Sequence, residues 1–116
     1  MALATLVSDN GLISGNWLAT ANAAAREVVE FGNGIGIAKD DIASGATGAI
    51  YRFGGEFTAA AATGVAWAAG AQLYWNTTSD VLTTVASGAV VAGIATALKA
   101  SATATANFCL MLNGLK

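Results

Sequence analysis

Residues 67–84, WAAGAQLYWNTTSDVLTT, carry the pattern that decides the fold. Two short runs of strand-prone residues, QLYWN at 72–76 and DVLTTV at 80–85, flank the polar connection TTS at 77–79. A polar connection of this length between two such runs is typical of a β-hairpin. The stretch carries a single charge, Asp80. Such an uncharged segment could be a membrane span, a ligand pocket or a surface that a partner covers.

Alternation of side chains extends the β pattern beyond this hairpin. In residues 49–58, AIYRFGGEFT, the aromatic residues Tyr51, Phe53 and Phe57 share one parity, and Ile50, Arg52, Glu56 and Thr58 share the other. A period of two is the signature of a half-buried strand. Two later segments alternate in the same way: residues 90–98, with Val90, Ala92, Ile94 and Leu98 on one face, and residues 105–113, with Ala106, Phe108, Leu110 and Leu112 on one face. Short strands with closely spaced glycine turns predict an all-β fold, a small β-barrel or sandwich of short antiparallel strands.

One segment departs from this pattern. Residues 19–30, ATANAAAREVVE, have the composition of a helix, in which Glu27 and Glu30 would lie one turn apart. The same residues also suit an alanine-rich crossing between strands. The sequence leaves one short helix near residues 19–30 and this crossing as two open alternatives.

The composition points to a single domain with an unusually uncharged surface. A chain of 116 residues is one domain by length, here 1–116. Only 10% of its residues are charged, against about 25% in average proteins. Such a chain is either a tightly packed small domain or a subunit whose surface is covered in an assembly, and we favour the second interpretation. The uncharged windows 57–79 and 81–98 are interrupted by Thr, Ser, Gly and Asn, and no cluster of Lys or Arg flanks either window, so we expect no membrane span.

No motif for catalysis or for a cofactor is present. The chain has no His and one cysteine, Cys109, which excludes Ser-His-Asp and Cys-His pairs and metal sites built on imidazole or on cysteine pairs. Asp40-Asp41 is interpreted as a polar turn, and GNGIG at 32–36 as a flexible turn, because residue 37 is Ile where a dinucleotide fingerprint needs Gly. The chain has no basic run for nucleic acid. We therefore expect no enzyme, no cofactor, no metal and no nucleic-acid partner, with Cys109 a buried inert thiol.

The order of the short motifs resembles a known family. The motifs are GIA at 36–38, DIASG at 41–45, LYW at 73–75, VLTT at 81–84, GIA at 93–95 and LMLNG at 110–114. In this order and spacing, over roughly residues 30–114, the chain is similar to a family of small tailed-phage proteins that includes capsid decoration (cement) proteins. The alanine-rich run at 19–25 departs from the glycine-punctuated strands with which that family commonly opens.

The resemblance implies a structural protein of the virion. The implied fold is all-β, and the implied place is the exterior of the capsid, after synthesis in the host cytoplasm. The implied partners are the major capsid protein and further copies of the same chain, arranged as homotrimers on local three-fold positions. A protein that bridges several capsid subunits gains affinity from many weak contacts. The alternatives are a soluble non-enzymatic β-barrel binding module of other origin, which would be absent from purified particles, and a membrane-inserted protein, which would need detergent.

Four residues are the candidate assembly contacts. The segment Met1–Gly11 is apolar and short, and we interpret it as an N-terminal arm with Leu3 and Leu6 as contacts. Trp17 and Trp67 lie near predicted turns, and tryptophan is enriched at protein interfaces. These four residues, Leu3, Leu6, Trp17 and Trp67, are the hypothesis for the surface at which copies or capsid subunits meet.

Overall fold

Nine β-strands form the secondary structure of residues 3–8, 12–31 and 34–110, which are the residues that the computed structural model describes. The strands are β1 (Thr5–Ser8), β2 (Ile13–Leu18), β3 (Val28–Phe31), β4 (Gly34–Ala38), β5 (Thr47–Ala60), β6 (Gln72–Asn76), β7 (Val81–Thr83), β8 (Ala89–Ala95) and β9 (Thr105–Leu110). No helix occurs in these described ranges. The predicted all-β fold of short antiparallel strands is therefore confirmed.

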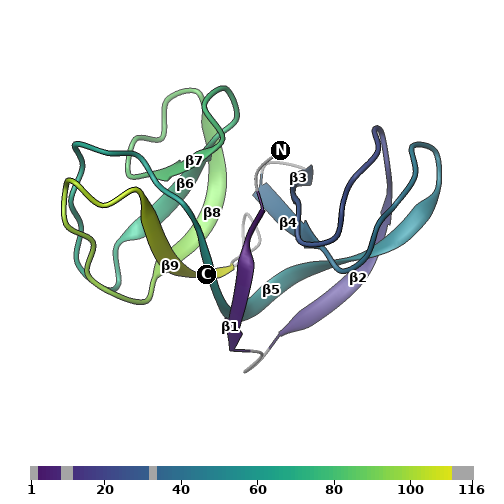
Figure 1. Ribbon diagram of the computed structural model, residues 1–116, viewed down its shortest axis with the longest axis horizontal. Coiled ribbons are helices and arrows are strands. Elements are labelled where there is room, and N and C mark those ends of the chain that lie inside the picture. The colour runs from purple at the N-terminus through teal and green to yellow at the C-terminus, as the bar shows by residue number, and fades with distance from the viewer. Residues whose placement is uncertain (1–2, 9–11, 32–33, 111–116) are drawn as a thin grey trace.

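The strands form one sheet that curls into a partial ring. The pairing order is β3-β4-β5-β9-β8-β6-β7, and β1 and β2 both pair antiparallel with β5. A parallel contact between Gly34 of β4 and Val91 of β8 joins two strands that are far apart in this order. In Figure 1 the result is two lobes, one formed by β6 to β9 and the other by β1 to β4, with β5 running from one lobe to the other.

The long strand β5 bends at a pair of glycines. Gly54 and Gly55 have φ values of 84° and 66°, a backbone region in which residues with a Cβ are strained. A Cβ on Gly55 would also lie 3.0 Å from the backbone oxygen of Ser8 in β1. The pairing with β9 shifts register between Gly54 and Phe57, so this is a bulge in the ladder. The bulge lets one strand take part in both lobes.

Two hydrophobic clusters lie along β5. The larger cluster contains Phe57, Phe108 and Tyr51, with ring centroids 6.1 Å apart for Phe57 and Phe108 and 5.9 Å apart for Tyr51 and Phe57. The smaller cluster contains Ile50 with Ala38, Ile42 and Val29. Ile50 shares its parity with Arg52 and Glu56 but is fully buried, because it packs in this smaller cluster.

Residues 19–27 of the alanine-rich segment form the crossing between β2 and β3, residues 28–30 belong to β3, and the helical alternative was wrong. Ala23 forms a β-bridge with Ile42, which holds the segment in an extended conformation. The backbone NH of Ala24 donates to Oε1 of Glu27 at 2.9 Å, and Arg26 has a φ of 69°. These long-range and turn contacts override helix propensity, which is a weak determinant by itself.

The predicted hairpin at 72–85 is confirmed as β6 and β7. Asn76 caps the turn, because its side-chain oxygen accepts from the backbone NH of Thr78 at 2.9 Å and of Ser79 at 3.0 Å. Asp80, with a φ of 56°, donates its NH to the Asn76 carbonyl at 2.8 Å. Asn and Asp are the residues that tolerate such turns best.

Other predicted segments differ in extent. Strand β8 ends at Ala95, and Leu98 is 78% exposed beyond it, so the predicted strand to residue 98 was too long. In the ladder of β6 and β8, Leu73 pairs with Gly93 and Tyr74 pairs with Val91, so Ala92 has no partner and forms a β-bulge. Because of this bulge, the residues before and after Ala92 do not keep the predicted alternation of faces. The inward face predicted for the last segment is confirmed for Ala106, Phe108 and Leu110, whereas Leu112 lies outside the described residues. Asp40 and Asp41 are exposed, in and just after a bend, in agreement with the predicted polar turn. The flexible turn predicted at 32–36 was wrong for residues 34–36, which are buried in β4, and residues 32 and 33 lie outside the described residues.

Candidate functional site

Exposed apolar side chains gather along one margin of the sheet. Four large apolar side chains here are more than half exposed: Leu3 (52%), Val7 (52%), Ile13 (56%) and Leu18 (62%). Val7 lies in β1, Ile13 and Leu18 lie in β2, and Leu3 precedes β1 and forms a β-bridge with Glu27. Strands β1 and β2 pair with successive parts of β5, so the backbones of these four residues follow one side of β5, here called the β1–β2 edge. Ile13 and Leu18 are five residues apart in β2, so their side chains project from opposite faces of this edge. Within the described ranges, β2 has β5 as its one strand partner. An edge strand with apolar side chains is a surface that proteins normally cover.

Three of the four predicted contact residues lie at this edge. Leu3 is exposed and bridges to Glu27, while Leu6 faces Phe57 in the ladder and packs against the larger core cluster. Trp17 is half-buried opposite Gly48 and packs against the smaller cluster. The segment predicted as an arm thus contributes Thr5–Ser8 as a strand of the sheet, with Ala4 buried in the core.

The fourth candidate, Trp67, lies in the opposite lobe and is buried. Its exposed fraction is 6%, and the ammonium group of Lys99 lies 4.9 Å from its ring centroid. Lys99, itself 2% exposed, donates from Nζ to the carbonyls of Val65 at 2.5 Å and Ala100 at 3.0 Å. A backbone bridge also joins Trp67 to Lys99. Together these contacts hold the connection between β5 and β6 against the connection between β8 and β9.

A groove of about 360 Å³ lies where the two lobes meet, and its walls come from both. One wall comes from β2, β3 and the crossing between them, and the other comes from the β6–β7 hairpin. The lining residues are Trp17, Thr20, Ala21, Asn22, Ala23, Glu27, Val28, Val29, Glu30, Trp75 and Asp80. Three of these residues are carboxylates, and none is a lysine or an arginine.

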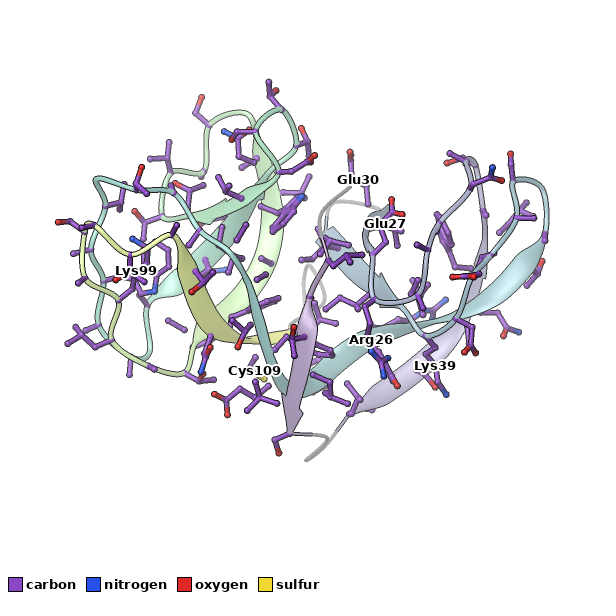
Figure 2. All side chains as sticks on the ribbon, viewed as in Figure 1. Arg26, Glu27, Glu30, Lys39, Lys99 and Cys109 are labelled. Carbon is purple, nitrogen blue, oxygen red and sulfur yellow. The ribbon has the colours of Figure 1, made fainter. Side chains whose placement is uncertain are left out.

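Charge is separated around β3 and β4. Figure 2 shows Glu27 and Glu30 on the same side of the molecule, with Arg26 and Lys39 directed the other way. The guanidinium of Arg26 lies 5.6 Å and the ammonium of Lys39 lies 5.5 Å from the ring centroid of Tyr51. The groove therefore faces solvent with acidic groups, while the nearest basic groups are held at Tyr51.

Sequence reasoning missed this groove. Glu27 and Glu30 are close in the chain, but Asp80 lies 50 residues after Glu30, so no local motif contains all three carboxylates. The sequence contains only a weak indication of the groove, namely tryptophans at 17 and 75 in a chain with few charges.

Two further features are structural rather than chemical. A second hollow, of about 540 Å³, is lined by residues 22–24, Glu27 and residues 41–43. Its polar side chains serve the backbone, because Asp41 accepts from the Ala25 NH at 2.8 Å and Asn22 from the Ser44 NH at 2.8 Å. Cys109 is half-buried rather than fully buried, so that part of the prediction was wrong. Partial burial, and secondarily the negative charge of Glu56, raise the pKa of its thiol.

The described part of the chain holds no group of acidic, cysteine and histidine side chains suited to a metal ion. Nor does any helix in that part reach the length and apolar character that a membrane span requires.

Comparison with protein families decides the identity. The family model for phage cement proteins matches residues 8–110. The chain belongs to the phage cement protein family. Searches of curated proteins and of solved structures gave no match. The resemblance noted in the sequence over residues 30–114 is thus confirmed, and the match reaches further toward the N-terminus, through β2 and the alanine-rich crossing.

As a cement protein, the chain is a structural and non-enzymatic component of the virion. It binds the outside of the capsid and stabilises the shell. This role needs surfaces rather than a catalytic centre, and the β1–β2 edge and the groove are the two surfaces of this cement protein that the geometry singles out.

Proposed function

We propose that this cement protein binds the major capsid protein as a homotrimer, and that the β1–β2 edge forms the contact between copies. The observation that carries the proposal is the gathering of Leu3, Val7, Ile13 and Leu18 on one margin, out of six large apolar side chains that are exposed in the described ranges. The other two are Val85, which follows β7, and Leu98, which lies between β8 and β9, both in the lobe of β6 to β9. Apolar area that a second copy covers contributes roughly 25 cal/mol per Å².

The predicted contact residues fit this arrangement in two ways. Leu3 is available for direct contact, whereas Leu6 and Trp17 lie partly beneath the edge and support it. Trp67 acts indirectly in this proposal, because it holds the connection between β5 and β6 in place rather than facing a partner. Three linked copies bind the shell more tightly than one, because after the first contact the others form at a high effective concentration.

Co-sedimentation with phage heads that lack the protein tests the capsid part of the proposal. We expect saturable binding of the purified protein to these heads, with a stoichiometry in multiples of three per binding position. Unexpanded and expanded heads are compared, and binding to expanded heads alone would show that shell maturation creates the site. Absence of binding to both kinds of head would contradict the proposal.

Sedimentation equilibrium tests the contact between copies. The wild-type protein is expected at three times the chain mass of 11.5 kDa. Leu3→Ser is expected to shift the equilibrium toward the monomer by about tenfold, since a buried leucine contributes about 1.5–3 kcal/mol. Leu98→Ser is the matched control, because Leu98 is even more exposed but lies in the other lobe. Equal behaviour of the two variants would rule out the β1–β2 edge as the contact.

A further inference from the structure

We infer that the groove between the lobes binds an arginine side chain of the major capsid protein. This inference rests on the proposed function, and it adds the chemistry of the partner group and the place where it is held. It concerns a surface separate from the exposed residues of the β1–β2 edge.

The size of the groove suits a side chain rather than a larger element. Its volume of about 360 Å³ equals that of roughly a dozen water molecules, at ~30 Å³ each in the liquid. An inserted side chain with its neighbouring backbone fills a space of this order.

The lining has the two properties that arginine recognition requires. The half-buried Trp17 and Val28 provide apolar and aromatic surface, with the buried Trp75 and Val29 behind them, and Glu27, Glu30 and Asp80 provide negative charge. A guanidinium group stacks on aromatic rings and forms paired hydrogen bonds to carboxylates, while its aliphatic stem covers apolar surface. Lysine offers a compact charge without a planar surface for stacking, so arginine is the better occupant.

The carboxylates of the groove are not neutralised by basic residues in its lining. Glu30 and Asp80 are exposed, and Glu27 uses Oε1 for the NH of Ala24 at 2.9 Å. The lining contains no Lys or Arg, and the nearest basic residue in sequence, Arg26, is directed toward Tyr51 instead. A cation from a partner therefore meets uncompensated negative charge here.

The position of the groove also links binding to stability of the protein. Its walls belong to both lobes, so an arginine in the groove contacts β2 and β3 of one lobe and the β6–β7 hairpin of the other. A ligand that binds the folded protein and not the unfolded chain stabilises the folded protein by mass action. We therefore expect capsid binding to tie the two lobes together.

Head binding by two charge-matched variants tests the inference. The groove variant Glu30→Gln with Asp80→Asn removes two negative charges, and asparagine tolerates the positive φ at residue 80. The control variant Asp40→Asn with Asp41→Asn removes two charges outside the groove and keeps the acceptor for the Ala25 NH. We expect the groove variant to bind heads at least about tenfold more weakly, with a smaller salt dependence, and the control to stay within about twofold of wild type.

A peptide titration tests the groove without the capsid. The probes are acetyl-Gly-Arg-Gly-amide and the same peptide with citrulline, the neutral isostere of arginine, followed through the indole NH signals in NMR spectra. We expect the Trp17 signal to shift with the arginine peptide, to shift little with citrulline, and to lose its response in the groove variant.

The outcomes separate the two proposals. Failure of the wild-type protein to bind heads contradicts the proposed function, and the peptide titration then decides the groove alone. Equal head binding by the groove and control variants, or equal shifts with arginine and citrulline, overturns the inference about the groove.

Discussion

Replacing Phe57 with alanine is expected to lower the free energy of unfolding by about 3–5 kcal/mol. Phe57 is fully buried and lies opposite Phe108 in the β5–β9 ladder and opposite Leu6 in the β1–β5 ladder. Its removal leaves a cavity at the point where three strands meet, next to the glycine bulge. Since domains of this size are stable by about 5–15 kcal/mol, a large share of the total is lost.

Thermal unfolding followed by circular dichroism measures this effect. At about 4–8 °C per kcal/mol, the melting temperature of Phe57→Ala is expected to fall by roughly 12–40 °C. Phe57→Leu keeps most of the volume and is expected to cost about 1.5 kcal/mol or less. Phe53→Ala is the positional control, because Phe53 has the same parity in the sequence but is only half-buried. A loss for Phe57→Ala no larger than that for Phe53→Ala would contradict the core assignment.

Replacing Trp67 with alanine is expected to destabilise the protein by about 3–5 kcal/mol as well. The indole is 6% exposed and covers the ammonium group of Lys99, which is itself almost fully buried. Without the ring, Lys99 keeps its two carbonyl acceptors but faces a cavity, and a buried charge without compensation is costly. Urea unfolding of the variant measures the loss.

Head binding then distinguishes a structural role of Trp67 from a direct contact. Trp67→Phe keeps an aromatic ring beside Lys99, and we expect it to retain most of the stability and all of the head binding. Trp67→Ala is expected to bind heads normally at a temperature where it remains folded. Lost head binding by a Trp67→Ala protein of unchanged stability would instead make Trp67 a contact residue.

The fold class and the hairpin of β6 and β7 could be predicted because their signals are local. Alternating parity marks a strand over five or six residues, and the polar turn at 77–79 needs no distant partner. The helix alternative at 19–30 arose from the same local reasoning. It was wrong because Ala23 forms a bridge with Ile42 and the Ala25 NH donates to Asp41. Both partners follow β4 in the chain, so local propensity does not include them.

The sequence by itself determined the all-β class, the inward positions of Phe57 and Phe108, the absence of a catalytic pair built on histidine, and the resemblance to cement proteins. Each of these follows from residue types and spacing within short segments. Only the tertiary structure decided that Ile50 and Lys99 are buried, that β1 and β2 share one margin of β5, and that Glu27, Glu30 and Asp80 line one groove. The physical reason is that bulges at Gly54–Gly55 and Ala92 change parity along the strands, and the contact of Gly34 with Val91 brings distant strands together.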